Sequence, residues 1–299
     1  MRIAITGGTG LVGRALTKLL VNKGHQVIIL TRSPKKDEQS VIYVKWLTED
    51  AMPEKKLEGI DAIVNLAGES INNGRWTAEQ KRKIYESRIS ATEEVLRIIR
   101  LLERKPSTLI NASAIGIYPA SYEKNYTETS REIGEDFLAK TVADWEKKAE
   151  EASKHGIRVA YGRFGIILDK SEGALPLMAL PYKMFVGGKI GNGQNWMSWI
   201  HIQDVASALL FAIENNIFGP FNVVATNPKR MNSFGKTLAI VLRRPHYFPV
   251  PGFALKLALG EKSQLVIEGQ HVTPEVLQQH GFHFQFPDLP NALSNIYKE

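Results

Sequence analysis

A glycine-rich segment near the N-terminus has the residue types and spacing needed to bind a diphosphate group. Residues 6–13 read TGGTGLVG, which places glycines three apart at Gly7, Gly10 and Gly13. Such a turn needs a tight bend, close backbone approach to a pyrophosphate and close packing of a helix on a strand. Glycine meets these needs without steric cost, and a helix that follows would aim its free N–H groups at the phosphates. The predicted contacts are Gly7, Thr9, Gly10, Leu11, Val12 and Gly13.

The residues after the second predicted strand distinguish between two forms of a dinucleotide. NAD sites usually carry an acidic residue here, which binds the adenosine ribose. This sequence instead has Thr31-Arg32-Ser33, with Lys35 and Lys36 close behind. An arginine can stack on adenine and pair with a 2′-phosphate, to which the hydroxyls can donate. We predict NADP as the cofactor, with Thr31 and Arg32 as contacts. NAD is the alternative, in which case the basic residues form an ordinary solvated loop.

Later strand ends add further candidates for the same site. The small residues of Leu66-Ala67-Gly68 would let a ribose and nicotinamide lie against the backbone, although simple packing also explains them. Arg163 ends a strand at the same predicted edge, where it would contact an anion or form a structural ion pair. Arg88, on a long predicted helix, is a similar case. The predicted contacts here are Leu66, Ala67, Gly68, Glu69, Arg88 and Arg163.

The elements that would position these residues alternate between strand and helix. Short apolar runs predict strands, and helical spacing of apolar residues predicts the helices between them. Such alternation indicates a parallel sheet covered on both faces. The predicted strands are 2–6, 26–30, 62–66, 108–112, 158–164 and 221–225, and the predicted helices are 11–22, 78–102, 136–155 and 204–214.

After residue 165 glycine and proline become frequent and the helix signals shorten. We therefore predict an α/β fold, in which a Rossmann-type doubly wound parallel sheet carries a smaller, loop-rich C-terminal substrate lobe. The expected domains are an NAD(P)-binding domain over 1–165, a substrate lobe over 166–244 that partly returns to the first domain, and a C-terminal segment over 245–299.

Composition excludes several classes of protein. The chain has 299 residues and contains no run of about 18 apolar residues, so we expect no membrane-spanning helix. MRIAITGG enters a strand pattern directly, so we expect no signal peptide and a cytoplasmic location. The absence of cysteine excludes disulfides, cysteine-ligated zinc and thiol catalysis. The histidines form no ligand cluster, and His201 is expected to begin a helix, so we predict no metal.

The net charge of +7 raises the question of an acidic partner. Lysine and arginine are spread along the chain in small clusters such as residues 81–83 and 243–244. This spread favours a solvated basic surface over a nucleic-acid interface, with part of the excess serving an anionic cofactor or substrate. The expected partner is a small-molecule substrate, and neither nucleic acid nor membrane is expected.

Several motifs resemble a known superfamily. TGGTGLVG, NLAGE and SAIGIY are similar to the extended short-chain dehydrogenase/reductases. RWTAEQKRKIYESRI, FLAKTVADWE, GNGQNWMSWIHIQD and GQHVTPEVL resemble one branch, the epimerase family proteins, often labelled nucleoside-diphosphate sugar epimerases and sometimes cell-division inhibitors. The resemblance covers essentially the whole chain. It implies NAD(P) binding, oxidoreductase or isomerase chemistry, a nucleotide-sugar-like substrate as one class, a domain of unknown function at 245–299, and a homodimer as one assembly.

The sequence departs from the superfamily where its members catalyse. Active members use a Tyr-x-x-x-Lys pair, in which the tyrosine is the acid/base and the lysine lowers its pKa and holds the nicotinamide ribose. The matching helix reads FLAKTV from Phe137. Alignment on Phe137 puts Thr141 at the lysine position, and alignment on Glu146 puts Leu138 and Val142 at the pair. Neither alignment supplies a tyrosine and a lysine.

Other residues would then have to move the proton. Active members of the superfamily also use a Ser or Thr that precedes the Tyr-x-x-x-Lys pair. Alignment on Tyr118 places Ala114 at this Ser/Thr position, with Ser113 beside it. Ser113, Tyr118 and Glu69 follow strand ends and are replacement candidates, of which Ser113 and Tyr118 are the predicted catalytic residues. Two hypotheses follow: an NADP-dependent oxidoreductase or epimerase-like enzyme, or a dinucleotide-binding sensor that does not catalyse.

Overall fold

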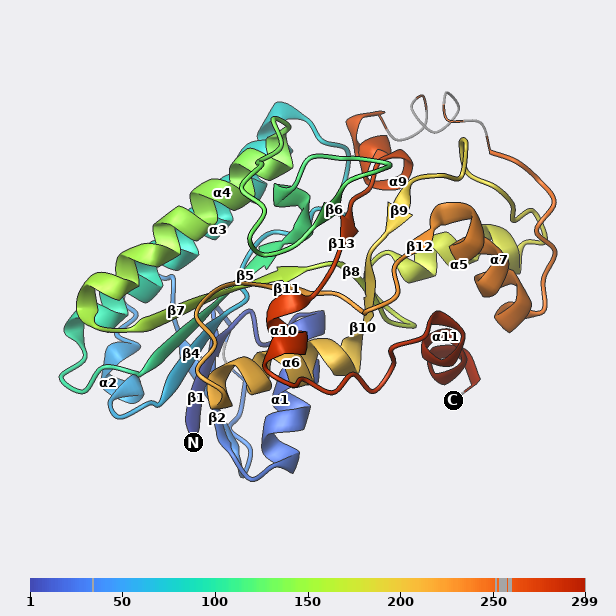
Figure 1. The fold of residues 1–299 in the computed structure, drawn as a ribbon. Coiled ribbons are helices and arrows are strands. Elements are labelled where there is room, and N and C mark those ends of the chain that lie inside the picture. The colour runs from blue at the N-terminus through green and yellow to red at the C-terminus, as the bar shows by residue number, and fades with distance from the viewer. Residues whose placement is uncertain (34, 251, 253–256, 258–259, 299) are drawn as a thin grey trace.

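A seven-stranded sheet forms the centre of the computed structural model, which describes residues 1–299 except 34, 251, 253–256, 258–259 and 299. All of its strand pairings are parallel, in the order β11-β7-β5-β4-β1-β2-β3 (Figure 1). The strands are β1 (Arg2–Thr6), β2 (Gln26–Thr31), β3 (Val41–Lys45), β4 (Ala62–Asn65), β5 (Thr108–Ala114), β7 (Arg158–Phe164) and β11 (Gly219–Val223). The order reverses between β1 and β4, which confirms the Rossmann-type doubly wound fold and places a ligand crevice at the carboxyl ends of these two strands.

Helices cover both faces of this sheet, and alternate side chains of each strand supply the two cores. Ile3 and Ile5 pack in a cluster with α1 and α6, whereas Ala4 packs in a cluster with α3. Figure 1 shows α1 and α6 on one side of the sheet and α3 and α4 on the other. The helices of these layers are α1 (Leu11–Asn22), α2 (Glu54–Leu57), α3 (Ala78–Leu101), α4 (Phe137–Glu150) and α6 (Ile202–Glu214), with short 3-10 turns at η1 (Ile115–Ile117) and η2 (Glu151–His155).

The chain leaves the sheet after β7, builds a second lobe, and returns. The lobe has its own apolar core, formed by α5, α7 and α11 around Trp199 and Phe234. Its elements and those of the C-terminal segment are β8 (Ile166–Leu168), α5 (Leu175–Lys183), β9 (Trp196–Met197), β10 (Trp199–His201), β12 (Lys229–Arg230), α7 (Met231–Leu242), η3 (Gly260–Ser263), α9 (Gln264–Ile267), β13 (His271–Val272), α10 (Glu275–Gln279) and α11 (Leu289–Lys298). The short strand β6 (Asn125–Tyr126) comes earlier in the chain, before α4, and pairs with β13. Two elements within the expected lobe range of 166–244 do not belong to the lobe: β11 is a strand of the central sheet, and α6 packs on one face of that sheet.

Candidate dinucleotide site

The glycine-rich turn joins β1 to α1 at the crevice. Gly7 has a left-handed φ of 64°, and a Cβ there would lie 2.6 Å from the carbonyl oxygen of Leu66. A Cβ at Gly13 would collide with the carbonyl oxygen of Gly7. These two glycines are therefore required by the protein itself, one for the turn against β4 and one for packing α1 on β1.

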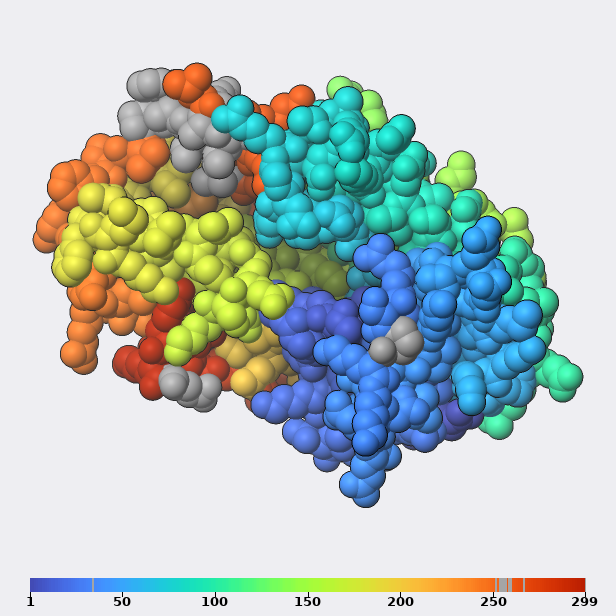
Figure 2. Space-filling model, turned by 180° about the vertical axis from the view of Figure 1, so that it is seen from behind, coloured from blue at the N-terminus to red at the C-terminus, as the bar shows by residue number. Residues whose placement is uncertain are grey.

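Gly10 differs because the space beside it is open. A Cβ there would meet a single atom within 4 Å, the Gly7 carbonyl oxygen at 3.3 Å. Gly10 is the N-cap of α1 and offers no side-chain cap, and no side chain of a described residue accepts from the first N–H groups of the helix. Figure 2 shows a hollow between these N-terminal residues (blue) and the yellow-green residues of the second lobe. A diphosphate fits this end of the helix, where free amides and the positive end of the helix dipole favour an anion.

A buried hydroxyl holds the turn after β4 beside the glycine-rich turn. Thr6 Oγ1 donates to Asn65 Oδ1 (2.6 Å) and accepts from the amides of Leu66 (3.0 Å) and Ala67 (3.1 Å). Thr6 and Asn65 are fully buried. These positioning residues were missed by the sequence analysis, although a polar residue at the end of each of two apolar strands was a usable signal.

Arg32 lies at the end of β2 with its side chain exposed, and no described residue forms a hydrogen bond or ion pair with it. The neighbouring Thr31 Oγ1 accepts from the amide of Ser33 (3.3 Å). The Thr31 hydroxyl also lies within donating distance of the Ser33 carbonyl oxygen (3.5 Å), so the free polar group at this end of β2 is the guanidinium of Arg32, a group that pairs well with phosphate.

Arg88 is a second cation at the crevice, and it is largely buried. Its Nη1 donates to the carbonyl oxygens of Glu69 (3.1 Å) and Ile84 (2.8 Å), and its Cζ lies 5.2 Å from the centroid of the Trp145 ring. A Cβ at Gly68 would lie 3.2 Å from Cζ. Burial lowers the pKa of Arg88 to about 10, with an opposing contribution from the charge of Glu69. Within the described part of the chain no carboxylate forms an ion pair with it.

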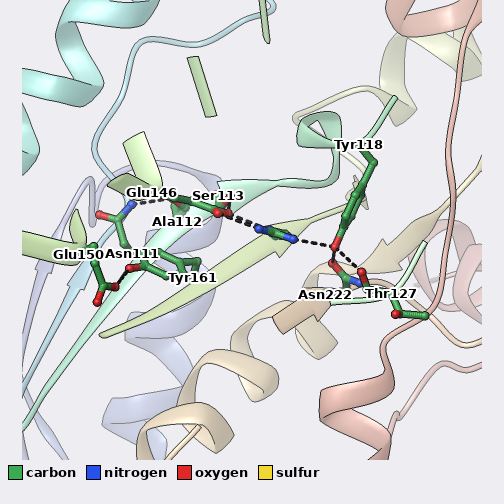
Figure 3. Close-up of polar contacts among 10 residues, drawn as sticks. Asn111, Ala112, Ser113, Tyr118, Thr127, Glu146, Glu150, Tyr161 and Asn222 are labelled. Carbon is green, nitrogen blue, oxygen red and sulfur yellow. Dashed lines mark hydrogen bonds and ion pairs between the residues drawn. The ribbon is translucent and has the colours of Figure 1, made fainter. Parts of the chain in front are cut away.

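Three other predicted site residues meet in one buried network on the α4 side of the sheet (Figure 3). Ser113 Oγ donates to Glu146 Oε1 (2.5 Å), and Arg163 makes a bidentate pair with the same carboxylate through Nε and Nη2 (2.8 Å each). Arg163 Nη1 also donates to the hydroxyl of Tyr118 (2.8 Å). The sequence left two roles open for Arg163, anion binding and a structural ion pair. The structure shows the ion pair, with Glu146 as the partner.

Tyr118 is buried and its hydroxyl has partners on every side. The hydroxyl accepts from Arg163 and lies within donating distance of the Thr127 carbonyl oxygen (3.0 Å) and Asn222 Oδ1 (2.9 Å). Burial raises the pKa of Tyr118, while the charge of Arg163 opposes that rise. A cavity of about 420 Å³ borders this network between α4 and β7, and none of the residues that line it belongs to the glycine-rich turn. The geometry favours a packed tyrosine whose hydroxyl is satisfied.

The start of α4 carries no free acid/base group at the Tyr and Lys positions of either alignment with the superfamily; Phe137 and Leu138, at the two possible tyrosine positions, are half-buried. Phe137 meets Trp76 edge to face, with ring centroids 6.0 Å apart, and Lys81 Nζ lies 5.5 Å from its centroid. Thr141 is buried and its Oγ1 donates to the Phe137 carbonyl oxygen (2.8 Å), while Val142 is also buried. Neither Phe137 nor Val142 carries a group that could transfer a proton, and the hydroxyl of Thr141 bonds to its own helix.

His201 is buried and is the N-cap of α6, in agreement with its predicted place at the start of a helix. Its Nδ1 accepts from the Gln203 amide (3.2 Å), and burial lowers its pKa to about 4. Over the residues that the structure places, no group of three or more histidine or acidic side chains is arranged to hold a metal ion. In the same residues no helix has both the length and the apolar character needed to cross a bilayer.

Comparison with known proteins agrees with this geometry. The model of the NAD dependent epimerase/dehydratase family matches residues 3–224, and a domain of unknown function (DUF1731) matches residues 250–296. The epimerase family protein YfhF of Bacillus subtilis (strain 168) is 50% identical over 298 residues, covering 99% of this chain and 98% of its own. The crystal structure of human epimerase family protein SDR39U1 with NADPH has a TM-score of 0.88 at 30% identity, covering 100% of this chain and 99% of that one. A nucleoside-diphosphate sugar epimerase from Corynebacterium glutamicum has a TM-score of 0.77 at 34% identity, covering 99% and 58%.

Proposed function

Because the chain belongs to the NAD-dependent epimerase/dehydratase family, we propose that it is an NADP-dependent oxidoreductase or epimerase-like enzyme acting on a small polar substrate. The observation that carries this proposal is the open space at Gly10, where α1 begins without a side-chain cap. When bound, the coenzyme supplies a nicotinamide that accepts or donates hydride. The backbone of Gly7, Thr9, Gly10, Leu11, Val12 and Gly13 holds its diphosphate.

Arg32 makes NADP the preferred coenzyme in this proposal. Its exposed guanidinium has no partner in the described part of the chain, so it can pair with a 2′-phosphate at no cost in internal contacts. Thr31 adds a hydroxyl at the same strand end. The relative that supports this choice is human SDR39U1, whose crystal structure contains NADPH.

Arg88 would face the nicotinamide half of the coenzyme. It lies under Gly68, at the end of β4, where the crevice of a doubly wound sheet receives the second ribose. A cation at this place can hold ribose hydroxyls, which is the positioning task of the superfamily's lysine. The backbone of Leu66, Ala67 and Gly68 would form the adjoining surface.

Glu69 is the candidate for proton transfer with the best access. It follows β4 beside Arg88, and its Oε1 accepts a single hydrogen bond, from Asn73 Nδ2 (2.7 Å). The other candidates, Ser113 and Tyr118, are 3% and 1% exposed and hydrogen-bonded inside the protein. A catalytic carboxylate needs access to the reacting group, so Glu69 is the first residue to test.

The start of α4, without a free acid/base group in either alignment, favours one alternative function, a dinucleotide-binding sensor without catalysis. Phe137 and Thr141 are packed where the superfamily's acid/base pair stands in one alignment. A sensor would bind NADP(H) tightly and yet turn over no carbonyl compound or nucleotide sugar. NADPH oxidation against a panel of both substrate classes separates the two functions.

Replacement of Gly10 tests the proposal at its origin. A Gly10→Val variant would place methyl groups where the diphosphate lies, and we expect NADPH affinity, measured by calorimetry, to fall at least a hundredfold. The fold should survive because the Cβ meets one atom in the protein. Unchanged affinity at an unchanged melting temperature would overturn the proposal. Mass spectrometry of any ligand that co-purifies would identify the coenzyme directly.

A further inference from the structure

Two long stretches in the C-terminal half of the chain, which include most of the second lobe, contain no acidic residue. Residues 173–203 and 215–260 contain eight lysines and arginines but no aspartate or glutamate. The remainder of the chain has 30 basic and 31 acidic residues, so the entire net charge of +7 comes from these two stretches. The even spread of lysine and arginine noted from the sequence conceals this, because it is the acidic residues that are unevenly placed.

Large apolar side chains are exposed on the same lobe. Leu177, Leu180 and Met184 follow one another at helical spacing along α5, and they are 64%, 51% and 64% exposed. Phe185 and Val186 continue the exposed row immediately after the helix. A contiguous row of exposed apolar side chains on a folded protein usually marks an interaction site for a protein, a membrane or a ligand.

Other contacts join this row into one patch. The amides of Tyr247 and Phe248 both donate to the Gly187 carbonyl oxygen, which places two more exposed aromatic side chains beside Val186. Arg244 lies with its Cζ 4.4 Å from the centroid of the Phe185 ring. We define the lobe patch as Leu177, Leu180, Met184, Phe185, Val186, Tyr247 and Phe248. Figure 2 shows the yellow-green to yellow stretch that carries most of it on the outer surface beside the hollow.

Cations without ion pairs in the described part of the chain lie on the elements that carry the lobe patch and on α7 behind it; the Nζ of one of them, Lys183, lies 5.8 Å from the Tyr297 ring centroid. Lys183 lies within α5, Lys189 follows it, and Lys236 and Arg243 belong to α7 and its end. Among the described residues none of these cations forms an ion pair with a carboxylate. Exposed leucine, methionine and aromatic side chains together with cations that have no ion pair are the composition of a surface that enters an anionic bilayer interface.

We infer that the lobe patch docks on an anionic lipid bilayer. Its apolar side chains would enter the interface between headgroups and acyl chains, and the cations would meet the lipid phosphates. Phe185 follows the C-cap of α5 with the left-handed φ of 63° that often ends a helix, and it is 56% exposed at this position. A second copy of the chain is a poor occupant, since two such patches would bring like charges together without an acid between them. The inference does not depend on the proposed function.

Vesicle sedimentation of the full chain tests the inference. We expect it to bind vesicles of phosphatidylcholine with 30% phosphatidylglycerol, to bind pure phosphatidylcholine little, and to be released by 0.5 M NaCl. A Leu180→Asp/Phe185→Asp variant should lower the partition coefficient more than tenfold. Leu101→Asp is the matched control, because Leu101 is 55% exposed on α3, away from the patch, and it should change binding less than twofold. Lys183→Gln and Arg243→Gln should each reduce binding to anionic vesicles roughly fivefold.

The same variants keep the inference falsifiable. NADPH affinity and melting temperature should not change in them, because no patch residue belongs to the crevice or to a core. Equal sedimentation on neutral and anionic vesicles would overturn the inference, and so would equal losses in the patch variant and Leu101→Asp. Absence of vesicle binding, together with a dimer in ultracentrifugation that the patch variant dissociates, would also overturn it and assign the patch to a second copy.

Discussion

The crevice at Gly10 and the network at Glu146 both lie near the carboxyl ends of parallel strands, yet they are opposite in character. At the crevice the backbone amides at the start of α1 and the guanidinium of Arg32 lie open. In the network Ser113 and Arg163 both bond to the Glu146 carboxylate, Arg163 also donates to the Tyr118 hydroxyl, and all three residues are buried. A place at a strand end therefore does not make a residue a ligand of the coenzyme, because the face of the sheet and the available partners decide whether its polar atoms are free.

The largest expected effect comes from breaking the network. Glu146→Gln removes the charge that compensates Arg163, and the two side chains are 12% and 9% exposed. An uncompensated buried arginine should lower the free energy of unfolding by about 3–5 kcal/mol, which urea denaturation measures. Glu93→Gln, which removes an exposed partner of Lys148, is the control and should change it by less than about 0.5 kcal/mol. An equal, small loss in both would contradict the distinction between the two regions.

The next effect should separate binding from folding at Arg88. Arg88→Met keeps the apolar stem beside Trp145 and removes a largely buried charge that lacks an acidic partner among the described residues. We expect NADPH affinity to fall roughly tenfold, as expected for loss of one charge-assisted contact, while the melting temperature stays within a few degrees. A large loss of stability with unchanged affinity would make Arg88 a purely structural residue.

A selective effect is expected at Arg32. Arg32→Ala should weaken NADPH binding roughly tenfold to a hundredfold, because one charge-assisted pair with the 2′-phosphate is lost. NADH affinity should change less than twofold, and Lys23→Ala, another exposed cation on the same βαβ unit, should change neither. If Arg32→Ala lowers the affinities for NADPH and NADH equally, the end of β2 does not bind the 2′-phosphate.

The contrast between the two regions also explains what the sequence could predict. The glycine-rich turn depends on local geometry between a strand and the next helix, so its spacing was enough. The faces of Ser113 and Arg163 depend on strand register and on a carboxylate from α4, 33 and 17 residues away along the chain. β3 was missed although residues 41–44 read VIYV, a run of strand-favouring residues that was a usable signal. The lobe patch required the structure, since helical spacing alone does not say which face is exposed.

The smallest expected effect is the most informative about catalysis. Tyr118→Phe removes a hydroxyl that contacts Arg163, Thr127 and Asn222, so the free energy of unfolding should fall by about 1–2 kcal/mol. If Tyr118 is a packed residue, turnover on any substrate found in the panel should change less than about twofold, whereas loss of a general acid costs about a hundredfold or more. Glu69→Gln is the comparison variant, because Glu69 lies beside Arg88 and lacks the buried network. A large fall in turnover for Tyr118→Phe, with normal turnover for Glu69→Gln, would show that the network at Glu146, and not the crevice, contains the group that transfers the proton.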